Sequence, residues 1–585
     1  MKRLFFPSLF SFSTNRNKKT VPRREQQAQR RQKKKGSAMS SLRQTAMRLL
    51  VFVFLLPYFP FPTAVTANGA DAKQRENPVR LTVLQTTDLH GAAGAAGRDD
   101  IPGIARIVSI VESERKRDQE LLLIDCGDTA LGSFSSTLDG GDSMFRVMNL
   151  ARYDAWIPGN HDFDRGIPLL LKHAGMLEAR PLAANLEIQK EEGNAVFEDW
   201  ILLERKGLRI AVIGMVPEHL SQWIAPAQLE GSSRHGILET LDRILPRIMR
   251  ASPDLILLAV HAGEFTQGRL YKDGKRRSLS EITARYPQIH LLLGGHSHQC
   301  VPGKKLYPDS WFVQGPPFAE GAARTVIEYD RKQRRILSMQ TDILFSRDYP
   351  DSPETMDLLT PLLRETEIAA RKTVARFDCG EGGSSALRGN LSASAVTRLF
   401  CRAMTEETHA AAAFLSIPEK RSLPPSSPPF SPGTTAAGGS TVLTERQLFD
   451  WMPYENFITI LHLNSAEAEA IINEQERLEN RKSAMIAYGL EYRLNAERRS
   501  VEGPLLLSPG TQSREKGELW ESGRIRLPFA FSGYAASGAG GRYPVLRCIA
   551  ASEAVQRRDL PLTIRDAVRR FLMKNYPPSS AGGLK

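Results

Sequence analysis

Seven side chains that can bind metal ions occur in short glycine-containing clusters within the first 300 residues of the 585-residue chain. They are Asp88, His90, Asp128, Asn160, His261, His296 and His298. Seven carboxylate, imidazole and amide donors are too many for one tetrahedral zinc ion, but they suit two divalent ions that share a carboxylate. Asp128 stands near the middle of the order and is the natural bridge. Two ions about 3.5–4 Å apart would activate a water molecule and neutralise the oxygens of a phosphoryl transfer.

A histidine and a carboxylate stand next to Asn160 and add proton chemistry to these donors. They are His161 and Asp164, three positions apart. An imidazole that a carboxylate orients can donate a proton to a leaving alkoxide or stabilise charge on a phosphoryl group. We therefore expect His161 to act on a substrate and Asp164 to orient His161.

Each cluster directly follows a short apolar run, at 81–85, 121–124, 153–157, 255–260 and 290–293. Apolar runs that alternate with helix-like stretches, here 103–116 and 236–249, predict strands buried on both faces in an α/β fold. Ligands bind at the carboxyl ends of such strands. Two further apolar runs, at 181–184 and 208–216, also have strand character. One cluster alone is typical of an ordinary turn. Five clusters at strand ends indicate one shared site.

The ordered clusters resemble the motif set of the calcineurin-like metallophosphoesterases. The run from Asn160 to Asp164 and the preceding Gly103-x-x-Arg106 are similar to the 5′-nucleotidase branch of that family. The resemblance implies a four-layer α/β sandwich with two divalent ions (zinc, manganese, cobalt or iron) and His161 with Asp164 as the catalytic pair. It implies that one ion binds Asp88, His90, Asp128 and His298. It implies that the other binds Asp128, Asn160, His261 and His296.

The sequence predicts a catalytic domain over 78–345, a connector helix over 352–376 and a smaller α+β domain over 377–575. In the last of these, segments 389–391, 453–456 and 533–538 resemble the C-terminal domain of 5′-nucleotidases. The resemblance implies that Tyr454 and Tyr534 stack on a nucleobase, although both are also ordinary core aromatics by residue type. It implies further that Arg421 contacts the substrate.

Two departures from the family pattern put nucleotide specificity in question. Segment 416–421 reads Ser-Ile-Pro-Glu-Lys-Arg where the family has Asn-Gly-Gly-Gly-Ile-Arg, so the glycines that permit close backbone approach are absent. Segment 537–542 lacks the acidic residue that follows the second aromatic in the family. The metal chemistry depends on neither segment.

The first 48 residues carry nearly all of the net charge. They contain 14 Lys and Arg against one Glu, which leaves 64 basic and 64 acidic residues in the rest of the chain. A uniformly basic, nucleic-acid-binding body is therefore excluded. The apolar run 49–65 is interrupted by three prolines and is shorter than the roughly 20 residues that span a bilayer. We interpret 1–67 as a basic leader with a signal peptide; the alternative is a membrane anchor at 49–65.

These patterns predict an exported enzyme, periplasmic or extracellular, that contacts the membrane only transiently and acts on a small-molecule phosphate ester. The resemblance implies hydrolysis of 5′-nucleotides. The alternatives are nucleoside 2′,3′-cyclic phosphates, UDP-sugars, a non-nucleotide phosphate ester, or an inactive exported binding protein. Five cysteines exclude a dense disulfide framework. The oligomeric state is not predicted.

Overall fold

The computed structural model describes residues 78–94, 103–188, 196–264, 278–306, 308–377, 393–417, 441–480, 483–510 and 512–578. Asn77–Lys585 forms one compact unit. The predicted leader and signal peptide (1–67), the motif at 389–391, and Arg421 lie outside the described ranges.

Two six-stranded sheets carry the predicted metal ligands. The first has the order β14-β13-β1-β2-β3-β4, with strands Arg335–Phe345, Gly321–Asp330, Val79–Thr86, Leu122–Asp125, Ala155–Trp156 and Arg180–Pro181. The second has the order β11-β12-β10-β9-β7-β6, with strands Val301–Lys305, Trp311–Gln314, Leu291–Leu293, Leu255–Val260, Leu208–Met215 and Trp200–Arg205. Strands β1 to β4 run parallel to one another, as do β7, β9, β10 and β12.

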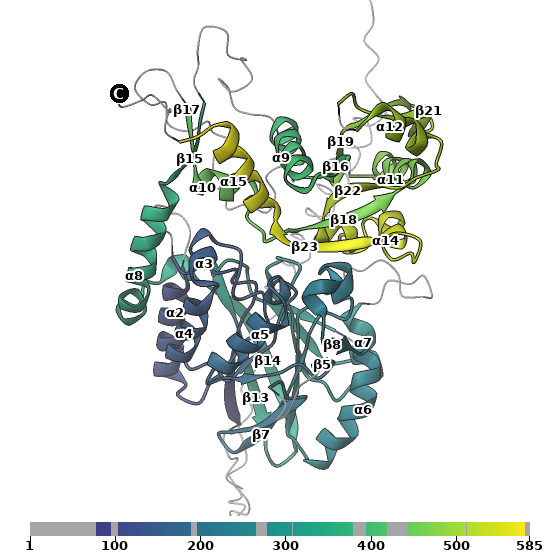
Figure 1. Ribbon diagram of the computed structural model, residues 1–585. Helices are drawn as coiled ribbons and strands as arrows, with labels where there is room; N and C mark the ends of the chain where they lie inside the picture. Colours follow the sequence, from purple (N-terminus) through teal and green to yellow (C-terminus); the bar gives the residue numbers. More distant parts are fainter. Residues whose placement is uncertain are drawn as a thin grey trace, which may run out of the picture. The chain divides into compact units, whose positions relative to one another are not determined.

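The strands are buried on both faces, as the apolar runs predict. Leu81 and Val83 of β1 pack with Leu257 of β9 in the core between the two sheets. Leu84, on the opposite face of β1, packs in the core beneath helices α2 (Ile104–Arg117), α4 (Asp142–Leu150) and α5 (Ile167–Met176). Helices α6 (Ile237–Arg250) and α7 (Leu279–Arg285) cover the outer face of the second sheet. Figure 1 shows α2 and α4 on one side of the strands and α6 and α7 on the other. This confirms the predicted four-layer α/β sandwich.

Two predicted strands are shorter than expected and one hairpin was not predicted. The run 153–157 contains only the two-residue β3, and the run 181–184 is replaced by the two-residue β4. Strands β13 and β14 form an antiparallel hairpin against β1. No polar cluster marks this hairpin, because both strands lie outside the parallel series that presents the ligands.

The second part of the fold is a smaller α+β structure, as predicted. Its five-stranded sheet has the order β19-β16-β22-β18-β23, with strands Ile486–Tyr488, Ala412–Leu415, Leu527–Ser532, Phe457–Leu463 and Arg557–Thr563. Helices α9 (Ala393–Thr408) and α15 (Ile564–Asn575) cover one face. The other face packs against helices α11 (Ser465–Arg477), α12 (Arg514–Glu521) and α14 (Pro544–Ala550).

The predicted connector helix over 352–376 is too long. Helix α8 spans Pro353–Ala370, and the chain then forms strand β15, Thr373–Phe377, which pairs with β17, Thr441–Thr444. The β-branched pair Thr373 and Val374 favours this extended structure. The boundaries of the two domains stay predictions.

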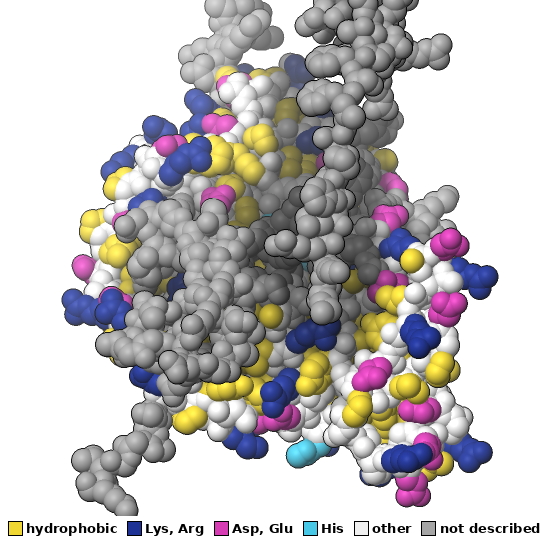
Figure 2. Space-filling model, turned by 90° about the horizontal axis from the view of Figure 1, so that it is seen from above, with side chains coloured by type: hydrophobic (Ala, Val, Ile, Leu, Met, Phe, Trp, Pro, Cys, Tyr) yellow, Lys and Arg dark blue, Asp and Glu magenta, His cyan; other side chains and the backbone are white. Residues whose placement is uncertain are grey.

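No helix within the described ranges combines the length and apolarity needed to cross a membrane. Figure 2 shows Lys and Arg side chains interspersed with Asp and Glu among the described residues of the visible face. This distribution agrees with the balanced charge of the chain after residue 48.

Candidate metal and catalytic site

The predicted ligands extend from the carboxyl ends of five parallel strands. Asp88 and His90 follow β1, Asp128 follows β2, and Asn160 follows β3. In the second sheet, one ligand follows β9 and two follow β10; these are His261, His296 and His298. Neighbouring strands end at the same sheet edge because they run parallel. The structure therefore brings together residues that are up to 210 positions apart.

The backbone at this sheet edge is strained. Five of the seven predicted ligands have positive φ angles: Asp88 (52°), His90 (49°), Asp128 (55°), His296 (70°) and His298 (52°). Residues other than glycine adopt this left-handed region at a cost, and such residues cluster at functional sites. The turns that carry the ligands pack closely against one another and hold the backbone in this conformation. A Cβ on Gly127 (φ 89°), for example, would lie 2.2 Å from the backbone nitrogen of Gly159 in the next turn.

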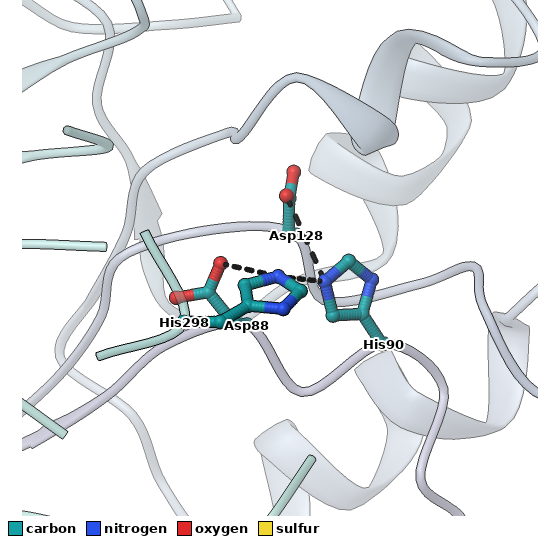
Figure 3. A group of neighbouring side chains, drawn as sticks. All are labelled: Asp88, His90, Asp128 and His298. Atoms are coloured by element: carbon teal, nitrogen blue, oxygen red, sulfur yellow. Dashed lines mark hydrogen bonds and ion pairs between the residues drawn. The ribbon is translucent and has the colours of Figure 1, made fainter. Parts of the chain in front are cut away.

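The first group of candidate ligands consists of Asp88, His90, Asp128 and His298, each of which offers one ligand atom within 4.8 Å of the others. Figure 3 shows that the His90 and His298 rings approach one another, and their Nε2 atoms are 2.9 Å apart. Burial and the neighbouring His298 hold the pKa of His90 well below its usual value. A neutral imidazole presents the lone pair that a metal ion requires.

The second group consists of Asp128, His261 and His296, and Asn160 adjoins it. His261 Nε2 lies 3.1 Å from Asp128 Oδ2, and His296 Nδ1 lies 2.7 Å from Asn160 Oδ1. Burial alone would raise the pKa of Asp128, but His261 and His161 outweigh it and hold the pKa well below its usual value. Asp128 is thus an ionised carboxylate common to both groups.

The ring nitrogens of the candidate histidine ligands are oriented for metal binding. Nδ1 of His261 lies 2.6 Å from the carbonyl oxygen of Cys126, which accepts a hydrogen bond only if this nitrogen carries the proton. The other nitrogen, Nε2, is buried 3.1 Å from Asp128 Oδ2. Burial would lower the pKa of His261, but Asp128 outweighs it and raises the pKa to about 9, so a metal ion bound here would take the place of the Nε2 proton. Carbonyl groups orient metal-binding histidines in this way. The same arrangement holds for His90, whose Nδ1 lies 3.1 Å from the carbonyl oxygen of Leu131.

His161 and Asp164 form a close pair at the edge of the ligand cluster. Both belong to a turn around the 3-10 helix His161–Phe163, in which residues three apart share a face. Nδ1 of His161 lies 2.8 Å from Asp164 Oδ2, and the His161 backbone nitrogen donates to Asp128 Oδ1 at 2.7 Å. Burial would lower the pKa of His161, but Asp164 and Asp128 outweigh it and raise the pKa to about 10. Because Nδ1 faces the Asp164 carboxylate, Nε2 is the ring nitrogen left for proton transfer.

Asp162 supports the site from behind, and no role was predicted for it. Its carboxylate accepts hydrogen bonds from four backbone nitrogens, those of Gly159 (2.8 Å), Asp128 (2.9 Å), Thr129 (3.1 Å) and Ala130 (3.2 Å). These bonds join the turn after β2 to the turn after β3. The only sequence signal for this role is the position of Asp162 inside the cluster at 159–164.

Of the three predicted substrate residues, Tyr454 contacts the site, Tyr534 is separated from it by Trp223, and Arg421 is outside the described ranges. The Tyr454 ring stacks on His161, with centroids 5.0 Å apart and planes at 18°. The Tyr534 ring stacks on Trp223, with centroids 6.1 Å apart and planes at 30°. Trp223 belongs to no motif, and nothing in the sequence pattern pointed to it.

Residues 81–300 match the family model of the calcineurin-like phosphoesterases. The matched segment contains all seven candidate ligands and the His161–Asp164 pair. This part of the chain is a calcineurin-like phosphoesterase domain, which confirms the resemblance drawn from the ordered clusters.

The relatives with the most similar sequences include UshA and 5′-nucleotidases. Protein UshA of Salmonella pullorum is 24% identical over 344 residues, which cover 52% of this chain and 62% of UshA. The 5′-nucleotidase of Vibrio cholerae is 27% identical over 247 residues, which cover 40% of this chain and 43% of that protein. The chain thus spans about three fifths or less of the length of these two relatives.

The fold is also found in a candidate 5′-nucleotidase from Staphylococcus aureus. That structure superposes with a TM-score of 0.66 at 16% identity, over 86% of this chain and 98% of the other. The likeness extends beyond the phosphoesterase domain into the smaller α+β part. The structural neighbour therefore shares the two-part architecture.

Proposed function

We propose that this protein is a phosphoesterase that hydrolyses nucleotide phosphomonoesters with two divalent metal ions. The observation that carries the proposal is the pair of ligand groups sharing Asp128, with the His161–Asp164 pair beside them. One ion would bind Asp88, His90, Asp128 and His298. The other would bind Asp128, Asn160, His261 and His296.

Two bound divalent ions supply the charge that activates a water and neutralises the oxygens of the transferred phosphoryl group. His161 has the remaining chemical role, because the neighbouring Asp164 carboxylate favours a proton on the imidazole. Asp164 holds the proton on Nδ1, so Nε2 is the atom that donates to the leaving oxygen. The Tyr454 ring covers one face of the imidazole and limits its rotation.

A nucleotide is the proposed substrate because the matched relatives include proteins named 5′-nucleotidase and because Tyr454 lies against His161 and Tyr534 against Trp223. Either ring can stack on a base. Arg421 is proposed to contact the substrate from the altered segment 416–421. That segment keeps three alternatives open: nucleoside 2′,3′-cyclic phosphates, UDP-sugars and a non-nucleotide phosphate ester.

Export through the leader 1–67 is proposed from composition alone. The proposed domains are the phosphoesterase domain at 78–345 and the substrate domain at 377–575. Mass spectrometry of the secreted or periplasmic protein tests the leader, and a mature N-terminus near residue 68 is expected. An N-terminus at the start codon in membrane fractions would favour the anchor at 49–65.

The test of function is phosphate release by the metal-stripped protein, residues 68–585, after addition of Mn²⁺ or Zn²⁺. The substrates are AMP, UDP-glucose, 2′,3′-cyclic AMP and an aryl phosphate. We expect metal-dependent turnover with AMP preferred. His161→Asn should lower kcat by about 10²- to 10⁴-fold. His235→Asn is the matched control, because this half-buried histidine lies beside Glu187 on strand β5, Leu186–Ile188, of a separate two-stranded sheet.

Three other outcomes change the conclusion. Preference for UDP-glucose or the cyclic nucleotide would keep the enzyme class and replace the substrate. Turnover of the aryl phosphate alone would keep the metal chemistry and reject the nucleotide. Metal binding without turnover of any ester would favour the inactive binding protein.

A further inference from the structure

Trp223 lies between a candidate metal ligand and the smaller α+β part of the protein. It directly follows the short 3-10 helix Leu220–Gln222, in the chain that leaves strand β7. Its backbone nitrogen donates to the carbonyl of Leu220 at 2.9 Å, and that of Ile224 donates to the same oxygen at 3.0 Å. These bonds fix the backbone that carries the indole.

The indole meets the ring of His296 edge to face. The ring centroids are 4.5 Å apart and the planes make an angle of 86°, which is a favourable aromatic geometry. Nδ1 of His296 is 2.7 Å from Asn160 Oδ1, and the His296 backbone nitrogen donates to Asp88 Oδ1 at 3.0 Å. Trp223 is thus an apolar wall for a residue whose ring and backbone make polar contacts with Asn160 and Asp88 of the candidate metal site.

The other side of the indole lies against a glycine of the smaller part. A Cβ built on Gly540 would lie 2.3 Å from Cη2 of Trp223, so a larger residue there must displace the indole. The φ angle of Gly540 is also positive, at 65°. Its backbone nitrogen donates to the carbonyl of Gln222 at 2.8 Å. The buried hydroxyl of Ser537 donates to the carbonyl of Ile224 at 3.1 Å.

The segment 533–540 therefore fixes the chain on both sides of Trp223, and Tyr534 stacks on the indole itself. We propose that Trp223 is a positioning residue that holds the imidazole of His296 for its metal ion. Segment 533–540 in turn holds Trp223, so metal binding at His296 depends on that segment. The proposal concerns the metal pair of the proposed function and rests on it. It assigns a role in metal binding to a residue outside the ligand set.

The test measures Mn²⁺ binding to the metal-stripped full chain by isothermal titration calorimetry. Trp223→Ala should weaken one of the two sites by about tenfold or more, the range found when a support of a metal-binding histidine is removed, and leave the other unchanged. Gly540→Ala should weaken the same site, because it displaces the indole. Trp200→Phe is the control, since that partly buried tryptophan begins strand β6 and packs beside α6.

A kinetic measurement separates positioning from general damage. With saturating Mn²⁺, the kcat of Trp223→Ala should return to within a few-fold of the wild-type value, whereas at limiting Mn²⁺ it should fall. Trp223→Phe, which keeps an aromatic ring, should bind Mn²⁺ more tightly than Trp223→Ala. Circular dichroism confirms that each variant is folded, and Trp223→Phe replaces Trp223→Ala in every comparison if the alanine variant is not.

The outcomes separate the two proposals. Wild-type Mn²⁺ affinity at both sites in folded Trp223 variants would overturn the role of Trp223 while leaving the phosphoesterase intact. A second outcome is that the Trp223 variants bind Mn²⁺ more weakly while the wild-type protein hydrolyses no phosphate ester. This outcome would support the role of Trp223 and reject the proposed function.

Discussion

Replacing Asp162 by asparagine tests whether the turns that carry the ligands depend on one buried carboxylate. Asp162 is 2% exposed and accepts four backbone hydrogen bonds, two on each oxygen. In Asp162→Asn one oxygen becomes an amide that donates hydrogen bonds, so two backbone N–H groups lose their acceptor in either amide orientation. A stranded buried donor costs about 1–3 kcal/mol, so the free energy of unfolding should fall by about 2–6 kcal/mol.

The assay is urea unfolding of metal-free protein, with Asp125→Asn as the matched control. Asp125 is also buried, and its Oδ2 accepts from the hydroxyl of Thr86 at 2.7 Å. A hydroxyl can reverse and accept from an amide, and burial raises the pKa of Asp125 to about 7, so an uncharged side chain suits this position. Asp125→Asn should therefore cost less than about 1 kcal/mol.

The two substitutions change the buried volume equally and differ only in the hydrogen-bonding partners of the side chain. The reasoning would therefore be refuted if both variants unfolded at the same urea concentration with the same dependence of the unfolding free energy on urea. Asp162→Asn should also bind Mn²⁺ more weakly, because Asp162 holds the backbone nitrogen of Asp128. Retention of wild-type Mn²⁺ affinity would show that the turns keep their shape without the carboxylate.

Two further predictions concern stability outside the metal site. Burial lowers the pKa of His173 to about 4 from the usual 6.5, although Asp142 lies 3.4 Å away. The contribution of neutral His173 to the free energy of unfolding is therefore complete above pH 6.5. It is lost as the pH falls to about 4, a change of about 3 kcal/mol. Unfolding measured across this range should show that slope in the wild type and a flatter one in His173→Phe, and equal slopes would contradict the prediction. Glu455 accepts from the buried Arg565 at 2.5 Å and from the more exposed Arg165 at 3.1 Å. Glu455→Ala should cost about 3–5 kcal/mol because it strands a buried cation, Arg165→Ala at most about 1 kcal/mol, and the reverse order in urea unfolding would contradict this assignment.

The ligand set and the sandwich could be predicted because both leave local signals in the sequence. A buried parallel strand is a continuous apolar run, and its polar end marks the sheet edge, so β1 and β9 were identified together with the clusters that follow them. Hairpin β13–β14 was missed since its strands end in no cluster. The connector helix was drawn too long because an amphipathic pattern does not show where strand β15 begins.

The supporting residues could not be predicted because their contacts depend on the folded chain. Trp223 and Gly540 are 317 positions apart, and neither carries a motif that names the other. Asp162 is visible only as an acidic residue within a cluster, whereas its four backbone partners appear once the two turns are in place. Sequence patterns thus identify groups that bind metal ions more readily than the groups that hold them.

The central claim is that two metal ions, sharing Asp128, are needed for phosphate-ester hydrolysis. The most direct measurement is the rate of aryl phosphate hydrolysis by the metal-stripped protein as Mn²⁺ is added in increasing molar ratio. We predict negligible turnover without ions and a rate that rises until two ions are bound per chain. Full turnover without ions, or a plateau at one ion per chain, would contradict the account.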